Sequence, residues 1–365
     1  MQPLLPVNKS GVSIATPIKR IDLERRERAE LSPFAAFSDA TRGRETSRPL
    51  DEYRTEFQRD RERLLHCKSF RRLSHKTQVF LAPEGDHYRT RMTHTLEVAQ
   101  IARSIARTLA LNEDLTEAIA LGHDLGHTPF GHTGEAAIDE ALKELSLTAH
   151  MQAESTPRSF NHARQSLRVV EDLEYEGAGL NLCWETRDGI LGHSGQHMPA
   201  TLEGQIVRTA DRIAYINHDI DDALRAGVLQ PGDVPQQYCE VLGHTAPQRI
   251  TTLVQDMIEA SVGRDLIALS EPINEAMLGL RSFLFEQVYL SPVAKTEEPK
   301  AKNVVKALFG YYVNNFDEVP LEYRVHKDGT QVECVQSCID YVAGMTDRYA
   351  LRLYEELFIP SSWDV

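Results

Sequence analysis

The chain has 365 residues, 41% hydrophobic and 26% charged, which is an ordinary globular composition and excludes wholesale disorder. Its formal net charge of -14 argues against a protein that coats nucleic acid, because such a protein needs a basic surface. That charge still allows a local basic pocket for a phosphorylated small molecule.

The cysteines and the apolar runs bear on the cellular compartment. Five cysteines are scattered along the chain, an odd number that fits a reducing cytoplasm better than a disulfide framework. No apolar run approaches the ~18 residues of a membrane span. The first twenty residues lack the apolar core of an export signal, so we expect a cytoplasmic protein without a membrane partner.

The first eighty residues carry mixed signals. Residues 1–50 are predicted to form a partly ordered arm, with one short helix at 19–30, that packs on a partner subunit. Residues 54–72 place apolar side chains near helical spacing with arginines between them. The favoured interpretation of these arginines is a solvated helix face, and the alternative is a basic rim that steers a polyanionic ligand. Residues 76–81 form the one short run with strand character.

Two strongly patterned helices follow. Within residues 91–111 the apolar side chains recur at i, i+3, i+4, i+7 and i+11, which is one continuous helix stripe. His94 lies one turn before this stripe. Residues 113–124 predict the second helix, with Asn112 as its cap, and its end carries His123 and Asp124.

The rest of the chain also reads as helix joined by loops. A helix is predicted to begin near His162, and residues 177–195 are predicted to be irregular because they are rich in glycine. His193 and His197 have a metal-like spacing there, but the glycine between them favours a loop. Further helices are predicted at 203–224, 251–270, 273–290, 303–315 and 332–357. The predicted fold is all-α, divided into an arm (1–50), a core (51–225) and a C-terminal helical part packed on the core (226–365).

The segment LGHDLGHTPFGHTGE, residues 121–135, is the densest chemical signal in the chain. It gathers His123, Asp124, His127, His132 and Glu135 within a few turns. A buried histidine or aspartate must be paired or ligated, because an unmet hydrogen bond costs roughly 1–3 kcal/mol. A metal ion with a water network is the simplest shared solution. For the His123-Asp124 pair alone, a pair of helix-end or surface groups is an equally good interpretation.

Four residues from three segments form a coherent candidate ligand set: His94, His123, Asp124 and Asp211. Two imidazoles and two carboxylates suit a divalent transition ion or magnesium better than a structural zinc. Four protein ligands on an ion that accepts about six leave two positions for water and substrate.

The order of these ligands resembles the H…HD…D signature of the HD-domain phosphohydrolases. The motifs FRRLSHKTQVF, RTRMTHTLEVAQIARSIA, HDLGHTPFGHTGE, FNHARQSLRVVE, DRIAYINHDIDDA and YVAGMTDRYA are similar to those of bacterial deoxynucleoside triphosphate triphosphohydrolases, the deoxyguanosine triphosphate triphosphohydrolase-like proteins. The resemblance is dense over residues 53–223, patchy towards the C-terminus and loose over the first fifty residues.

The resemblance implies a fold and a reaction. The fold is an HD-domain helical bundle with a C-terminal helical extension. The reaction is hydrolysis of a dNTP to the deoxynucleoside and intact triphosphate, with water attacking the α-phosphorus. One divalent ion per subunit, of manganese, magnesium, cobalt, iron, nickel or zinc, would be held by the four ligands.

The resemblance also assigns roles to residues around the ion, although a structural role remains the alternative for each. Glu135 would orient or deprotonate the attacking water. His132 or His127 would contact phosphate or protonate the leaving 5′ oxygen, and His162 matches a pocket histidine. The substrate-binding residues would be Arg91 on phosphate, with Tyr215 and Asp219 on sugar and phosphates.

Partners and competing functions follow from the same resemblance. It implies a homo-oligomer, a tetramer or hexamer, with a dNTP activator at a subunit interface; nucleic acid is not favoured as a partner. One alternative is an HD phosphohydrolase of another phosphoester, such as a monophosphate, a cyclic nucleotide or an alarmone. Another is a nucleotide-sensing or nucleic-acid-binding protein with little turnover.

Overall fold

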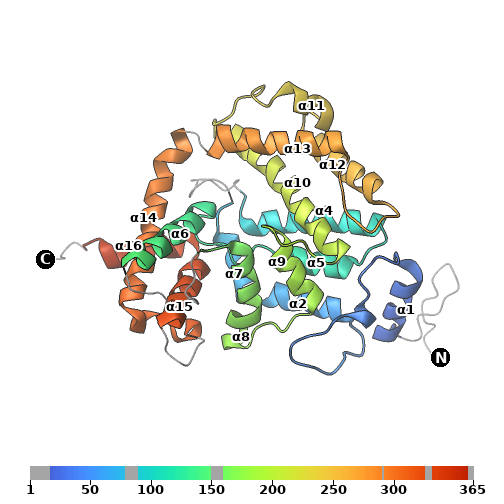
Figure 1. The fold of residues 1–365 in the computed structure, drawn as a ribbon, viewed down its shortest axis with the longest axis horizontal. Helices are drawn as coiled ribbons and strands as arrows, with labels where there is room; N and C mark the ends of the chain where they lie inside the picture. The colour runs from blue at the N-terminus through green and yellow to red at the C-terminus, as the bar shows by residue number, and fades with distance from the viewer. Residues whose placement is uncertain (1–16, 79–88, 149–158, 290–291, 325–330, 361–365) are drawn as a thin grey trace, which may run out of the picture.

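Helices make up the regular structure of the chain. The computed structural model describes residues 17–78, 89–148, 159–289, 292–324 and 331–360 (Figure 1). Within these ranges the β character is limited to one isolated bridge, between Thr77 and Thr90. The predicted all-α fold is confirmed. The prediction of strand at 76–81 is wrong for residues 76–78, and residues 79–81 lie outside the described ones.

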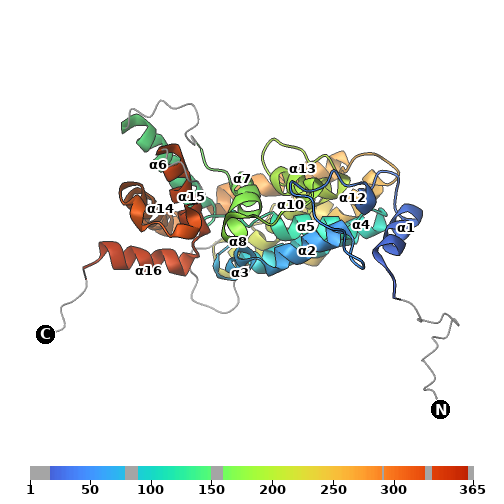
Figure 2. The ribbon, with the colours of Figure 1, turned by 90° about the horizontal axis from the view of Figure 1, so that it is seen from below.

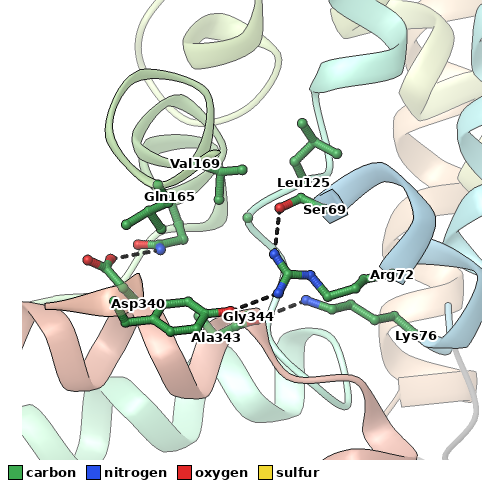
Figure 3. Close-up of a pocket in the computed structure, with 12 residues that line it drawn as sticks. Ser69, Arg72, Lys76, Leu125, Gln165, Val169, Asp340, Ala343 and Gly344 are labelled. Atoms are coloured by element: carbon green, nitrogen blue, oxygen red, sulfur yellow. Dashed lines mark hydrogen bonds between the residues drawn. The ribbon is translucent and has the colours of Figure 1, made fainter. Parts of the chain in front are cut away.

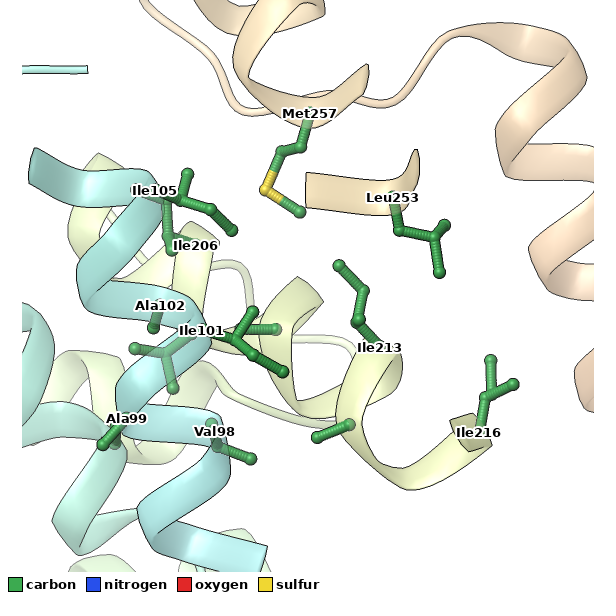
Figure 4. Close-up of a cluster of buried hydrophobic side chains, with 14 of the residues drawn as sticks. Val98, Ala99, Ile101, Ala102, Ile105, Ile206, Ile213, Ile216, Leu253 and Met257 are labelled. Atoms are coloured by element: carbon green, nitrogen blue, oxygen red, sulfur yellow. The ribbon is translucent and has the colours of Figure 1, made fainter. Parts of the chain in front are cut away.

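The largest hydrophobic core joins helices from the middle of the chain to helices that follow them (Figure 4). These helices are α4 (Arg91–Thr108), α5 (Glu113–Gly122), α10 (Leu202–Arg225), α12 (Ala246–Ser261) and α13 (Glu271–Leu284). The predicted stripe of α4 packs here, with Val98, Ile101 and Ile105 buried in the same cluster as Ile213 and Met257. This core therefore holds α4, α5 and α10 rigidly together.

A second core lies at the end of the molecule that carries the C-terminus (Figures 1 and 2). It is formed by α6 (His132–Thr148), α14 (Pro292–Asn314), α15 (Gln331–Gly344) and α16 (Asp347–Phe358). Ile138 of α6 is fully buried against this set, together with Phe309 and Val342. The C-terminal helices thus pack around α6, the helix that follows His123 and Asp124 in the chain.

A third, smaller core lies between these two. It joins α2 (Glu56–His66), α3 (Lys68–Arg72), α7 (His162–Arg168) with its π-helical continuation η3 (Val169–Leu173), and α9 (Trp184–Gly192). Leu64, Leu121 and Ile190 are buried in it. The remaining elements are α1 (Arg20–Glu30), η1 (Ser38–Ala40), η2 (Leu73–His75), α8 (Glu174–Gly177), α11 (Gln236–Leu242), η4 (Phe285–Tyr289), η5 (Phe316–Glu318) and η6 (Leu321–Tyr323).

The structure corrects the prediction that residues 177–195 are irregular, because α9 occupies the middle of that segment. Its glycines allow close helix packing. A Cβ added to Gly189 would lie 2.4 Å from Cδ1 of Ile119 on α5. The glycine content of α9 therefore reflects tight contact with α5. The prediction is wrong for residues 184–192, and the loop predicted between His193 and His197 is confirmed.

Other helix boundaries differ from the predicted ones. The helix predicted at 332–357 is two helices, because Thr346 caps α16 by accepting a hydrogen bond from the backbone N–H of Tyr349. Helix α12 ends at Ser261, nine residues before the predicted end at 270. By contrast, α1 and the Asn112 cap of α5 lie where the sequence placed them.

The arginines of residues 54–72 are mostly engaged within the protein. Arg54, Arg59 and Arg61 pair with carboxylates, and Arg63 donates to the backbone carbonyls of Leu180 and Asn181. These contacts favour a paired helix face over a basic rim. Among the helices of the described ranges, none combines the length and apolar character that crossing a bilayer requires.

Candidate metal centre and active site

The four predicted metal ligands meet where α4, α5 and α10 come together. His94 lies in the first turns of α4, which Thr90 caps, and His123 is the residue at which α5 ends. Asp124 follows directly, and Asp211 lies in the middle of α10. The close approach of α5 to α9 depends on Gly122, where an added Cβ would lie 2.5 Å from Ile190.

The ligand atoms of these residues converge. His94 Nε2 lies 3.0 Å from Asp211 Oδ1, and His123 Nε2 lies 3.7 Å from the same oxygen. His123 Nε2 also lies 3.5 Å from Asp124 Oδ1. Donor atoms bound to one ion at ~2.1 Å are roughly 3 Å apart when adjacent and ~4.2 Å when opposite. The separations fit a single ion between His94, His123 and Asp124, and Asp211 lies against this group through His94 Nε2 and His123 Nε2.

The hydrogen bonding of His123 supports this fit. Its Nδ1 lies 2.6 Å from the backbone carbonyl of Ala120, which can only accept, so Nδ1 carries the proton. Its Nε2 is buried and has no hydrogen-bond partner. A buried, unpartnered lone pair facing two carboxylates is the arrangement expected of a metal ligand whose second nitrogen is held by the protein.

The carboxylates are held in the ionised form that ligation requires. Burial opposes ionisation of Asp124, but His123, His127 and Arg91 outweigh it and hold the pKa of that carboxyl well below its usual range. Burial likewise opposes ionisation of Asp211, but the hydrogen bond with His94 helps to outweigh it, and the pKa of Asp211 is lowered to about 2.

A second cluster adjoins the first and contains the residues predicted to be catalytic. One potential ligand atom from each of His127, His132, Glu135 and His162 lies within 4.8 Å of the others. Glu135 accepts from His132 Nδ1 at 3.2 Å and from His162 Nδ1 at 3.1 Å. These bonds outweigh burial and lower the pKa of Glu135 well below its usual range.

The two clusters are joined through His127. Its Nε2 lies 3.2 Å from Asp124 Oδ1, and its ring stacks on that of His162 with centroids 4.1 Å apart. Gly126 makes this approach feasible, since a Cβ there would lie 2.1 Å from the backbone nitrogen of Ser166 on α7. The structure therefore brings all the predicted ligands and catalytic candidates into one continuous array.

The three predicted substrate-binding residues are placed differently from one another. Arg91 is 2% exposed, and its Nη1 donates to Asp124 Oδ2 at 2.8 Å, so it faces the four predicted metal ligands. Tyr215 and Asp219 follow Asp211 at one and two turns of α10. Tyr215 is half-buried, and burial raises its pKa to about 12, so its hydroxyl stays protonated.

Two histidines that were not among the predicted ligands or catalytic residues also border the array. His193, at the end of α9, is buried with its ring 5.1 Å from that of His123, and burial lowers its pKa to about 3. His218 of α10 places its Nδ1 3.4 Å from His94 Nδ1. The spacing of His193 and His197 was a signal for the first of these, but its location depends on a helix that the sequence did not reveal.

The C-terminal helices hold the segment that carries the catalytic candidates. Lys76 is fully buried, and its Nζ donates to the carbonyl of Ala343 (Figure 3). The same Nζ also donates to the carbonyl of His127. Asp340 of α15 accepts from Gln165 of α7 at 3.0 Å. Asp347 of α16 accepts from the backbone N–H groups of Thr77 and Phe130, both at 3.0 Å.

Comparison with known proteins shows the family to which the chain belongs. Residues 91–216 match the HD domain, and residues 267–356 match the phosphohydrolase-associated domain. A deoxyguanosinetriphosphate triphosphohydrolase-like protein of Caldanaerobacter subterraneus subsp. tengcongensis is 55% identical over 334 residues, covering 91% of this chain and 94% of that protein. The chain belongs to this family.

Two further proteins are similar to this chain. A deoxyguanosinetriphosphate triphosphohydrolase-like protein of Desulfatibacillum aliphaticivorans is 46% identical, covering 94% of this chain and 98% of that one. Among solved structures, a hypothetical protein from Aquifex aeolicus matches with a TM-score of 0.45 at 20% identity, covering 82% of this chain and 68% of that one. HD domains bind divalent metal ions, and the buried group of His94, His123 and Asp124 could hold one.

Proposed function

We propose that this HD-domain phosphohydrolase cleaves deoxynucleoside triphosphates to the deoxynucleoside and intact triphosphate. The observation that carries the proposal is the contact between the two clusters, where His127 bridges from Asp124 to the Glu135–His162 pair. This places an acid–base group next to a metal group, as phosphoester hydrolysis requires. The names of the relatives support the choice of substrate.

The metal group consists of His94, His123, Asp124 and Asp211. A divalent ion bound there would polarise an oxygen of the α-phosphate and lower the pKa of a bound water. The protein prepares this site by keeping both aspartates ionised and the Nε2 lone pair of His123 free.

The second cluster is assigned the positioning and protonation steps. Glu135 is an ionised carboxylate of low basicity, so we assign it the orientation of the attacking water through its hydrogen bonds rather than proton abstraction. His127 is fully buried, and burial together with the charge of Arg91 holds its pKa well below the usual range. The side chain of His132 is 73% exposed, so we assign His132 the contact with the entering phosphate and the proton for the 5′ oxygen.

The α10 helix supplies the remaining substrate contacts in this proposal. Tyr215 and Asp219 lie one and two turns beyond Asp211, roughly 6 and 12 Å along the helix axis. The roughly 12 Å from Asp211 to Asp219 is about the length of a nucleotide. The tyrosine ring would crowd a ribose 2′-hydroxyl and so favour deoxyribose. The homo-oligomer and the activating nucleotide at its interface remain predictions.

The test is product analysis with each of the four dNTPs, singly and in mixtures, with manganese, magnesium or cobalt. We expect equimolar deoxynucleoside and tripolyphosphate, and no such products from the Asp211→Asn variant. Release of orthophosphate or pyrophosphate instead would indicate another phosphoester substrate. Nucleotide binding without any product would indicate a sensing protein.

A further inference from the structure

A second histidine supports the predicted ligand His94 from behind. His94 Nε2 faces Asp211 Oδ1 at 3.0 Å, so Nε2 is the nitrogen that would bind an ion. The other ring nitrogen of His94, Nδ1, lies 3.4 Å from Nδ1 of His218. The two rings meet edge-on, with an interplanar angle of 85°, and both side chains are buried. The contact between the two imidazoles is therefore shielded from solvent.

Helix spacing explains why these side chains meet. On α4, Glu97 follows His94 by three residues, and on α10, His218 follows Asp211 by seven. Residues separated by three or seven positions share one face of a helix. Because α4 and α10 pack together in the largest core, each helix supplies one predicted ligand and one residue beside it.

A carboxylate lies at the outer end of this contact. His218 Nε2 pairs with Glu97 Oε2, an oxygen that is buried although its side chain reaches the surface. Arg89 Nε lies 3.4 Å from the same oxygen, and Arg89 Nη1 lies 3.4 Å from Asp222 Oδ1. A buried carboxylate oxygen is costly without a donor or a positive charge beside it. Glu97 is thus fixed between a guanidinium and His218.

Metal binding at His94 would fix the protons along these contacts. A nitrogen that binds an ion uses its lone pair, so neutral His94 carries its proton on Nδ1. That proton faces His218 Nδ1, which must then accept it with a lone pair. His218 in turn carries its own proton on Nε2, where Glu97 accepts. One arrangement of protons therefore satisfies all three side chains.

We propose that His218 and Glu97 are positioning residues for His94, in a chain of contacts from the carboxylate through two imidazoles to the ion. The inference rests on the metal site of the proposed function and adds two residues to it. A carboxylate that accepts from a metal-binding histidine fixes the orientation of the ring and makes the ligand nitrogen more basic. His218 stands between the carboxylate and the ligand here, so it transmits both effects.

The other predicted imidazole ligand is held in a different way. His123 Nδ1 lies 2.6 Å from the backbone carbonyl of Ala120, an uncharged acceptor in its own helix. A side-chain substitution cannot remove that carbonyl, whereas His218 and Glu97 can be changed one at a time. The support of His94 is therefore the one that mutagenesis can test directly.

The test is the metal affinity of the intact protein, measured without nucleotide. The chain is stripped with a chelator, checked for folding by circular dichroism, and titrated with Zn²⁺ against a competing dye. The relevant site is the one that Asp211→Asn removes. His218→Leu should weaken this site by about 10–10²-fold, the usual effect of losing such a partner. His218→Asn, whose amide oxygen can replace the accepting Nδ1, should recover much of the loss.

Glu97→Gln separates the charge of the carboxylate from its shape. The amide oxygen can still accept from His218, so zinc affinity should fall by less than in His218→Leu. Glu117→Gln is the matched control, because Glu117 is also a partly buried carboxylate paired with arginines, Arg61 and Arg103, and it should bind zinc as the wild type does. Unchanged affinity in Glu97→Gln, or an equal loss in both variants, would overturn the role of Glu97.

The tautomer of His218 is a readout that a merely structural role would not move. In zinc-loaded protein labelled with ¹⁵N-histidine, nuclear magnetic resonance should show a single ring proton on His218, at Nε2. The signal is assigned by its absence from His218→Asn. A proton on His218 Nδ1 would contradict the proposal, because that nitrogen could not then accept from His94. This measurement decides even if His218→Leu does not fold.

Zinc affinity is independent of the proposed substrate. A chain that loses affinity in His218→Leu but releases no tripolyphosphate would refute the proposed function and leave this inference intact. A chain that hydrolyses dNTPs and binds zinc equally well in folded His218→Leu would do the reverse. A wild-type chain that binds no divalent ion would refute both.

Discussion

The candidate active site has two halves, and different parts of the protein hold them. The first half is the predicted ligand set, and the second is the cluster of His127, His132, Glu135 and His162. His94 and Asp211 belong to the long helices α4 and α10, whose neighbouring side chains fill the largest core. His127 lies on the segment between α5 and α6. Phe130 of that segment donates directly to Asp347, 217 positions away, and Lys76 links the carbonyl of His127 to that of Ala343. The first half is thus fixed by helix packing and the second by polar contacts with the C-terminal helices.

This difference indicates how changes should act. A substitution at the first half should remove bound metal. A substitution at the second half, or in the helices that hold it, should reduce turnover while metal stays bound at the predicted ligand set.

Asp211→Asn should abolish both turnover and the binding of metal at the predicted ligand set. The amide keeps the shape of the side chain but removes the charge that faces His94 Nε2 at 3.0 Å. Helix α10 should remain folded, because its neighbouring apolar side chains are unchanged. Metal titration and tripolyphosphate release measure the two losses. Full activity in this variant would place the catalytic metal elsewhere.

Asp211→Asn is a cleaner change than the truncation of Asp124. Asp124 is the ion-pair partner of the buried Arg91. Its removal would leave that guanidinium unpaired, at a cost of about 3–5 kcal/mol. A loss of activity after Asp124→Ala would therefore combine loss of metal with loss of stability.

Glu135→Gln should lower kcat by about 10²–10⁴-fold, the range for a group that positions or moves a proton. Metal should stay bound at the predicted ligand set, because Glu135 hydrogen-bonds to His132 and His162, which are not among the four predicted ligands. Steady-state kinetics beside a metal titration test this. Loss of that metal together with activity would show that the two halves are not separable.

The helices that carry the first half could be predicted from the sequence, whereas the contacts that hold the second half could not, for a physical reason. The apolar period of α4 and the Asn112 cap of α5 are local signals, and the structure confirms both. His193 depends on α9, whose glycines look like a loop until Ile119 is seen packed against Gly189. The contacts of Lys76 and Asp347 join distant segments and have no local pattern to reveal them.

Asp347→Asn should lower kcat by about 10–10²-fold, because a shift of ~1 Å in a catalytic group has an effect of this size. Metal should stay bound at the predicted ligand set. Asp347 Oδ1 accepts from the backbone N–H of Phe130, a non-glycine residue held at φ 62°. That left-handed conformation is strained and persists only where neighbours hold it. An asparagine weakens the contact and lets the segment from His127 to His132 relax.

Glu356→Gln is the matched control for Asp347→Asn. Glu356 lies on the same helix α16, and its exposed carboxylate pairs with Arg352 only one turn away. Its kcat should equal that of the wild type. An equal loss in both variants would show that α16 acts through general stability rather than through Phe130.

Lys76→Met should change how stability depends on pH. Burial and the charge of Arg72 lower the pKa of Lys76 to about 7, from an ordinary value of 10.5. Between these pH values the unfolded chain holds a proton that the folded chain has released, so this group makes the unfolding free energy rise with pH, by at most ~1.4 kcal/mol per unit. Below about pH 7 both states are protonated, and its contribution is constant.

Urea unfolding of both chains at pH 6, 7.5 and 9 measures this effect. The difference in unfolding free energy, wild type minus Lys76→Met, should be flat at the low end and grow as pH rises. Because Lys76 donates to the carbonyl of His127 on one side and Ala343 on the other, this slope reports on the junction between the catalytic segment and α15. A difference that does not change with pH would mean that Lys76 keeps its proton when folded, and that the junction is a permanently charged one.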